Sequence, residues 1–202
     1  MRTAAVSSSA VTAAAISLLL AAPSDLHAAG PAEAAAVAAL VRAPPAASLA
    51  SAVAASDGRW EVVYAPHIQR LSAPFAATIK PLRYTLSQSG TRLRSDVLCS
   101  APFGSSWLSA EGRVELRGDA VDVLFESFWV RSGEAGEPLG NPLTSGAPVS
   151  ALDSLINAVG RLGFVPSLSR FPVRYIDSEG LTVFEFPPLA TTIAARRVSV
   201  SD

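Results

Sequence analysis

From residue 59 onward, hydrophobic and polar side chains alternate along the chain with a period of two. Trp60, Val62 and Tyr64 form the first such series, in residues 59–65. Similar series occupy residues 79–87, 91–99, 106–118 and 120–131, and residues 171–186 and 191–200 add a strand–turn–strand and a last strand. Alternation with polar partners is typical of antiparallel strands that bury one face. The pattern predicts about seven or eight such strands.

Turn residues separate these segments. Gly118–Asp119 lies between two alternating series and has the form of a two-residue hairpin connection. A meander of this length would expose two edge strands unless the sheet closed on itself. We therefore predict a mainly β fold, an antiparallel β-barrel of about eight strands with one or two short helices. A barrel of this size is wide enough to hold one small ligand.

Two segments follow a helical period instead. Residues 31–45 begin at Pro31 and end at a Pro-Pro pair, which favours a short helix between them. Residues 150–163 have Ser150 as a candidate N-cap, with Asp153 three residues later. The apolar stripe of this second helix consists of Leu152, Leu155, Ile156, Val159 and Leu162. The Gly- and Pro-rich segment 132–148 between strand and helix is predicted to be a surface loop that serves as a lid.

The first 55 residues differ in composition from the rest, with 23 alanines and only four charged residues. Residues 11–22 form an apolar run too short to span a bilayer but of the length of a signal-peptide core, and small residues near Ala28 suit cleavage. Two hypotheses remain open: a secretory signal, or an organellar transit peptide followed by a lumenal signal. We divide the chain into a targeting segment (1–28), an Ala-rich helix and linker (29–57) and a β-barrel domain (58–200).

Charge and reactive residues narrow the function classes. The net charge of −1 gives no electrostatic attraction to nucleic acid. One cysteine, Cys99, excludes an intramolecular disulfide, and with only His27 and His67 as histidines no usual zinc site is expected. Cys99 is interpreted as a small apolar strand residue, with a reactive thiol as the alternative. The sequence predicts no catalytic residues and no cofactor.

Short motifs resemble those of the plastid lipid-associated proteins, the fibrillin family. The stretch DGRWEVVYAPH at 57–67 resembles the family's entry strand, with Gly58, Trp60 and Tyr64 at the motif positions. VLFESFWV at 123–130 looks like its middle strands, and Tyr175 and Asp177 in RYIDSEGLTV fit its closing Tyr-x-Asp motif. The chain departs from the family at Pro187–Pro188, where a basic arginine motif is usual; Arg196–Arg197 come later.

The resemblance implies a lipocalin-like barrel in a plastid, thylakoid-associated or lumenal, that binds or organises a carotenoid, a prenylquinone or a fatty acid without catalysis. Peripheral contact with a thylakoid or lipid-body membrane is also expected. Inward aromatic and aliphatic residues would form the ligand wall. The candidate ligand-binding residues are Trp60, Tyr64, Tyr84, Leu86, Trp107, Phe125, Phe128 and Phe184.

Two other function classes remain as alternatives. An enzyme acting on a carotenoid or an oxidised fatty acid would need a polar residue facing the cavity, such as His67, Asp96 or Glu126. A structural protein that coats lipid bodies or membranes would use Trp129, which neighbours Phe128 on one strand, the Ala-rich N-terminal helix, or both. Arg83, Arg94 and Arg113 are candidate head-group anchors, with solvated outward positions as the alternative for each.

Overall fold

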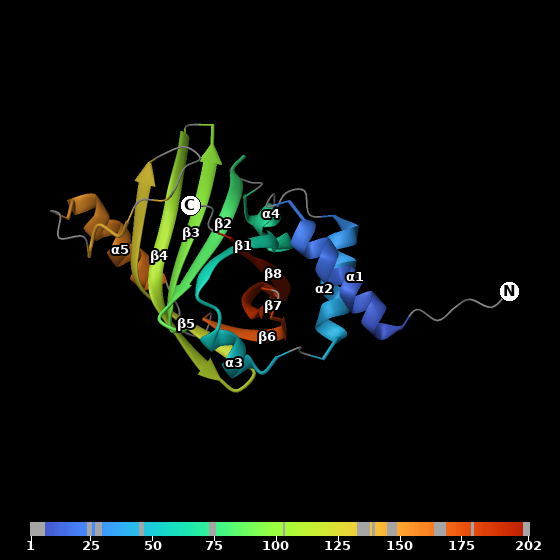
Figure 1. Cartoon of the computed structure of the whole chain (residues 1–202). Helices are drawn as coiled ribbons and strands as arrows, with labels where there is room; N and C mark the ends of the chain where they lie inside the picture. The colour runs from blue at the N-terminus through green and yellow to red at the C-terminus, as the bar shows by residue number, and fades with distance from the viewer. Residues whose placement is uncertain are drawn as a thin grey trace.

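The computed structural model describes residues 7–23, 26, 30–44, 47–72, 76–102, 104–132, 138, 140–144, 149–163, 169–178 and 180–199, apart from the side chains of Gln69 and Leu71. These residues form a mainly β protein with eight antiparallel strands in one sheet, as predicted. The strands are β1 (Gly58–Tyr64), β2 (Thr78–Ser87), β3 (Arg92–Ala101), β4 (Gly104–Arg117), β5 (Ala120–Ser132), β6 (Arg170–Ile176), β7 (Leu181–Phe186) and β8 (Thr191–Val198). Each strand pairs with the next and β8 pairs with β1, so the sheet closes as a barrel (Figure 1).

The described residues contain five α-helices, so the expectation of one or two was wrong. They are α1 (Ser8–Ala21), α2 (Pro31–Arg42), α3 (Leu49–Ala54), α4 (Pro66–Ser72) and α5 (Ala151–Gly163). The predicted helices correspond to α2 and α5. The Ala-rich segments of α1 and α3 form helices because alanine has the highest helix propensity, yet alanine leaves almost no amphipathic pattern to detect. The Pro187–Pro188 break in the last strands is a short 3₁₀ turn, η3 (Pro187–Leu189), between β7 and β8.

Helices α1 and α2 pack together against the outer face of the barrel, on the side opposite α5 (Figure 1). Leu19 and Leu40 are fully buried there against Leu181 and Val183. The guanidinium of Arg196 on β8 donates to the carbonyl oxygens of Leu20 and Ala22, which satisfies the C-terminal end of α1. No helix among the described residues is long and apolar enough to span a membrane. The targeting role of residues 1–28 stays a prediction.

The barrel interior is filled at one end. Helix α4 contributes Ile68 to a buried cluster with Val62, Leu82 and Ile193, and Leu26 from the N-terminal part of the chain is fully buried in the same cluster. Phe184, Phe186 and Val97 pack against its edge. The packed core therefore occupies the half of the barrel next to α4.

Strand β5 is paired with β6 over only three residue pairs, at Ala120, Val121 and Asp122. Beyond this seam, α5 lies along β5: the backbone N–H of Phe128 donates to Asn157 Oδ1 (3.0 Å), and Arg131 forms an ion pair with Asp153. The predicted cap of α5 is confirmed, because Ser150 Oγ accepts from the Asp153 N–H at 3.0 Å. Of its apolar stripe, however, only Ile156 is half-buried, and Leu152, Leu155, Val159 and Leu162 face solvent rather than the barrel.

A bulge in β5 divides the strand into two parts. Gly112 on β4 is the register partner of Phe125, whereas Glu111 is the partner of Ser127, so Glu126 is the extra residue. A Cβ atom at Gly112 would lie 2.1 Å from the carbonyl oxygen of Leu124. The close approach of the two backbones at the bulge therefore requires glycine at this position.

We predict that Gly112→Ala lowers the free energy of unfolding by about 2 kcal/mol or more, because the new methyl group meets backbone that cannot move without breaking the β4–β5 ladder. Chemical denaturation followed by circular dichroism measures the change. Gly140→Ala is the matched control, because a Cβ at that position meets no atom within 4 Å. Equal stability of the two variants would contradict the assignment of Gly112 as a packing requirement of the bulge.

Candidate ligand cavity

The half of the barrel opposite the filled end holds a cavity of about 220 Å³. Inward residues of all eight strands line it, and residues of α3 cover it. The lining residues are Leu49, Val53, Ser56, Trp60, Tyr84, Leu86, Leu93, Ser95, Val114, Val121, Val123, Phe125, Phe171, Val173, Ile176, Thr182, Phe184 and Ala195. The wall is thus almost wholly aliphatic and aromatic, which is the composition of a site for an apolar ligand.

Five of the eight candidate ligand-binding residues line this cavity: Trp60, Tyr84, Leu86, Phe125 and Phe184. Trp60 and Tyr84 are register partners on β1 and β2, and the ring of Tyr84 lies 6.5 Å from that of Phe184 between centroids. Alternation along single strands was sufficient to place these residues inside. The candidates Tyr64, Trp107 and Phe128 do not line the cavity, and each has a separate physical reason.

Tyr64 packs on the outer face of the barrel against the α1–α2 cluster. The register of β1 with β8 shifts between Val62 and Tyr64, and this irregularity ends the alternation that kept Trp60 and Val62 inside. Its position could not be read from the spacing, because no residue in this stretch marks the bulge.

Trp107 is buried on the opposite face of β4, where the guanidinium of Arg83 lies 5.7 Å from the centre of its ring. Trp107 is seven residues before Val114, which lines the cavity, so strict alternation already places the two on opposite faces.

Phe128 follows the β5 bulge. Its ring lies 5.8 Å from that of Phe125 but packs under α5, where a Cβ on Gly160 would be 2.4 Å from the Phe128 ring.

Helix α3 closes the open end of the cavity, and sequence reasoning assigned this segment to a linker. Ser48 caps the helix by accepting from the Ser51 N–H at 3.2 Å, and Leu49 and Val53, four residues apart, face the cavity. That cap and spacing were the available signal. The described residues of 132–148 do not line the cavity, and the rest of this segment lies outside the described residues, so a lid formed by this loop stays a prediction. Within the described part, Asn141 holds the loop to the sheet by donating to Glu111 and Ser127.

Polar contacts hold α3 against the barrel. The indole Nε1 of Trp60 donates to the Ser56 carbonyl at 2.8 Å, and the guanidinium of Arg197 donates to the Ala55 carbonyl. Arg197 also lies over the ring of Trp60, 5.1 Å from its centre. Directly after the helix, the Asp57 carboxylate accepts from the backbone N–H groups of Ser89 (3.0 Å) and Gly90 (2.7 Å) in the β2–β3 turn. The lid is therefore fixed to two strands, β1 and β8, and to one turn.

The cavity wall offers neutral hydroxyl groups as its polar features. These belong to Ser56, Tyr84, Ser95 and Thr182, and no charged side chain is among the described lining residues. Burial raises the pKa of the Tyr84 phenol well above its usual value, so this group stays neutral at physiological pH. Such a wall can donate a hydrogen bond to a neutral polar group but has no counter-ion for a buried carboxylate.

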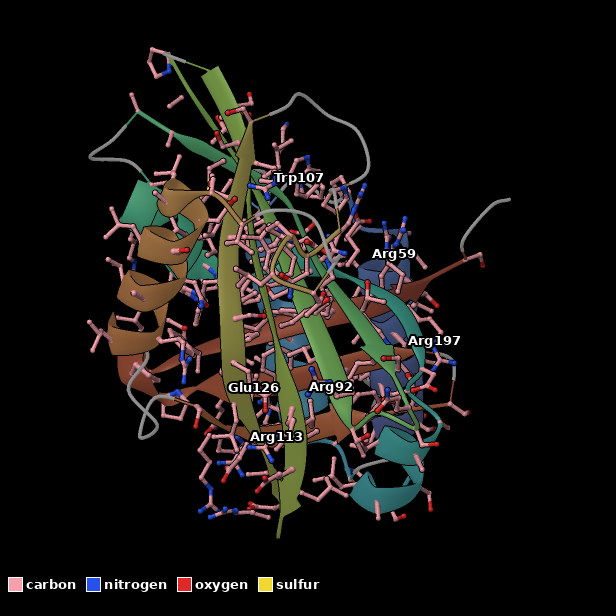
Figure 2. All side chains as sticks on the ribbon, turned by 90° about the vertical axis from the view of Figure 1, so that its left-hand side faces the viewer. Arg59, Arg92, Trp107, Arg113, Glu126 and Arg197 are labelled. Atoms are coloured by element: carbon pink, nitrogen blue, oxygen red, sulfur yellow. The ribbon has the colours of Figure 1, made fainter. Side chains whose placement is uncertain are left out.

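The arginines considered as head-group anchors lie outside the cavity. Arg83 contacts Glu61 and Trp107, Arg94 forms an ion pair with Asp96 (2.9 Å), and Arg113 forms one with Glu126 (2.7 Å). Figure 2 shows Arg92, Arg113 and Glu126 together on the outer surface of β3–β5. Of the three candidate anchors, Arg113 is exposed to solvent as the alternative hypothesis expected, whereas Arg83 and Arg94 point outward but are half-buried in their ion pairs.

The polar residues that an enzymatic cavity would need are also elsewhere. Asp96 is buried on the outer face of β3, where it accepts from Ser109 Oγ at 2.6 Å. Hydrogen bonding from Arg92 is the main cause that lowers the pKa of the exposed Glu126. His67 lies in α4, with Nδ1 2.9 Å from Thr191 Oγ1 and its ring stacked on Phe186. Burial lowers the pKa of His67 below 6.5.

The remaining reactive groups form no site within the described part of the chain. Cys99 lies half-buried in β3, as predicted, and burial raises the pKa of its thiol, which reduces the thiolate fraction. Among the described residues, no three His, Cys, Asp or Glu side chains come together in a way that could hold a metal ion. Trp129, the aromatic residue proposed as exposed, is fully buried beneath Arg94, whose guanidinium lies 5.3 Å from the centre of the ring.

Comparison with known proteins adds no relative. A scan against protein-family models finds no match for this chain, and a search of curated proteins finds no similar sequence. The likeness to plastid lipid-associated proteins therefore depends on the short motifs alone. Within those motifs, Trp60 lines the cavity, and Asp177 closes the β6–β7 turn by accepting from the N–H groups of Gly180 and Leu181 at 2.9 Å.

We predict that Asp57→Ala loosens the lid. Loss of two charge-assisted hydrogen bonds should raise amide hydrogen exchange at Ser89, Gly90 and α3 by about tenfold or more. Hydrogen-exchange mass spectrometry measures these exchange rates. The variant Asp57→Asn, which keeps one acceptor oxygen, should give an intermediate increase in exchange. Faster exchange confined to the β2–β3 turn would show that Asp57 does not hold α3.

We predict that His67 makes stability pH-dependent. Its pKa is depressed in the folded state, so below pH 6.5 the unfolded chain binds more protons than the native protein. The contribution of neutral His67 is complete above the unfolded pKa and is lost as the pH falls through the depressed folded pKa. His67→Gln should therefore flatten the dependence of the unfolding free energy on pH between about 7.5 and 5. Parallel curves for wild type and variant, measured by denaturant titration, would exclude this role.

Proposed function

We propose that the protein binds an apolar molecule, an isoprenoid or acyl compound, inside the barrel and performs no chemistry on it. The observation that carries this proposal is the cavity of about 220 Å³ beneath α3, with an aliphatic and aromatic wall. Burial of an apolar chain contributes about 0.8 kcal/mol per CH₂ group, so useful affinity needs few polar contacts. The motif resemblance and the predicted targeting segment support a plastid location, thylakoid-associated or lumenal, and a lipocalin-like mode of binding.

The size of the cavity limits which ligands can fit inside the barrel. An apolar cavity of about 150 Å³ holds one benzene molecule, so about 220 Å³ corresponds to roughly nine non-hydrogen atoms. This volume suits a substituted ring, such as the head of a prenylquinone, or about nine carbons of a chain. A whole carotenoid is far larger, and only its end could enter. The rest of a long ligand would leave beside α3, the one helix that covers the cavity in the described residues.

The chemistry of the cavity wall further limits the class of ligand that can bind. Burial of an ionised carboxylate without a counter-ion is costly, and the described wall has no positive charge. A neutral carbonyl or hydroxyl group, by contrast, can accept a hydrogen bond from Tyr84 or Ser95, which are cross-strand partners. The proposal therefore favours a neutral ligand over a free fatty acid whose head group enters the barrel.

The same observations weigh against the enzymatic alternative. His67, Asp96 and Glu126 do not line the cavity, and the lining residues include no imidazole or carboxylate among those that the structure describes. A hydroxyl without an adjacent base is a weak nucleophile, so the wall supports binding rather than catalysis.

Fluorescence titration tests the proposal. Trp60 is the one tryptophan that lines the cavity, so a ligand inside should change its emission, and Trp60→Phe should remove that change. At neutral pH, decanol and a short-chain prenylquinone should bind more tightly than decanoate, and affinity should rise with chain length up to about nine carbons and then level off. No saturable binding of any of these compounds to the folded protein would overturn the proposal.

We predict that Val123→Phe abolishes binding while leaving the fold intact. Val123 is buried at the cavity wall, and the added ring would occupy much of the available volume. The affinity for the ligand should therefore fall by about tenfold or more. The unfolding free energy should change by less than about 1 kcal/mol because the ring fills existing space. Val11→Phe, at an exposed position on α1, is the control and should bind normally. Unchanged affinity in Val123→Phe would place the ligand elsewhere.

A further inference from the structure

Helix α5 presents its apolar side to solvent. Leu152, Leu155, Val159 and Leu162 follow one another at helical spacing, and they are 65%, 61%, 60% and 85% exposed. Val149, just before the helix, is 43% exposed. We call these four helical residues the α5 ridge. Surface helices normally turn such a stripe toward the core, so an outward ridge marks a surface that contacts something else.

The outward orientation is fixed by polar contacts on the other side of the helix. Asp153 is buried and forms an ion pair with Arg131 of β5, and Asn157 accepts from the backbone N–H of Phe128. Gly160 lies against the Phe128 ring so closely that even a methyl group would not fit. Rotation of the helix to bury the ridge would break all three contacts. The ridge is therefore a stable surface feature of the folded protein.

The charges on α5 suit an anionic surface. Asp153 is the one acidic residue of the helix, and it is buried and neutralised by Arg131. Arg161 is the one basic residue of the helix and is exposed, next to Leu162 in the last turn. Arginine beside an apolar stripe can bury its stem and keep its guanidinium at the level of lipid phosphates. No negative charge of α5 would face such phosphates.

The position of α5 allows contact with a flat surface. Figure 1 shows the helix at the periphery of the molecule, beyond β5 and on the side opposite α1 and α2. The ridge is a row of side chains along about three turns of α5, and these side chains carry no hydrogen-bonding group. A lipid surface accommodates such a row without specific complementarity, whereas a protein partner would need a matching groove.

We propose that the α5 ridge docks the protein onto an anionic lipid surface, with the helix lying in the interface and Arg161 at the phosphates. The site is separate from the cavity and from Trp129, and the proposal does not depend on a ligand inside the barrel. Binding would follow from burial of the ridge in the acyl boundary plus attraction of Arg161 to anionic head groups.

Vesicle flotation of the full chain tests the proposal, with vesicles of phosphatidylcholine alone or mixed in equal parts with phosphatidylglycerol. The protein should float with the mixed vesicles. The double substitution Leu155→Ser and Leu162→Ser should lower the partition coefficient by about tenfold or more, and Arg161→Gln by about fivefold on the mixed vesicles only. All substituted side chains are exposed, so the variants should keep the wild-type circular dichroism and melting temperature.

The matched control is the pair Leu116→Ser and Leu189→Ser, two leucines that are each 43% exposed elsewhere on the molecule. This variant should float like the wild type. Absence of flotation of the wild type, or equal flotation of the ridge variant and the wild type, would overturn the proposal. A wild-type dimer in light scattering that becomes monomeric in the ridge variant, without flotation of either, would also overturn it and make a second copy of the chain the occupant of the ridge.

Discussion

The short pairing of β5 with β6 is the constraint on which much of the structure depends, because it leaves most of one edge of β5 without a partner strand. β5 has 13 residues, and β6 pairs with only its first three. The remaining backbone donors need partners, since a buried unsatisfied group costs about 1–3 kcal/mol. Helix α5 meets part of this need with its polar side, because Asn157 accepts from the Phe128 N–H. Asp153 adds an ion pair with the Arg131 side chain, and so the leucines of α5 point outward. Those leucines are exposed in the unfolded chain too. Their exposure in the folded protein therefore gives no stabilisation from burial, but it adds no cost to folding.

The same seam determines where the barrel is hollow. Val121, Val123 and Phe125 of β5 and Phe171 and Val173 of β6 line the cavity on the two sides of this short pairing, in which Val121 and Phe171 are register partners. At the other end, the chain supplies extra apolar groups from outside the sheet, Leu26 and Ile68, and these complete a packed core. An eight-stranded barrel has an interior that side chains can nearly fill. The cavity is what remains on the side where α3 only covers the opening.

The fold could be predicted from the sequence because alternation records which face of a strand is buried. The strands, the Gly118–Asp119 hairpin and the Ser150 cap of α5 all follow from local patterns. Local patterns do not predict irregularities in the strands. The bulges near Tyr64 and at Glu126 are set by pairing with the partner strands, and no residue in the bulged strand itself indicates them. Whether an inward phenylalanine is core or ligand wall depends on volumes summed over eight strands and a lid, which no single strand encodes.

The ridge and the cavity are connected through direct contacts. Gly160 of α5 lies against the Phe128 ring, and the Phe128 ring packs at a tilt on Phe125, with 5.8 Å between centroids; Phe125 lines the cavity. Because protein interiors are closely packed, displacement of α5 relative to β5 has to move Phe128, and Phe128 cannot move without affecting the wall at Phe125. Any free energy of coupling between the two sites is reciprocal: a ligand that favours one position of Phe125 favours the matching position of α5 by the same factor. The bulge at Glu126 is the element between them, since it sets the face on which Phe125 and Phe128 both lie.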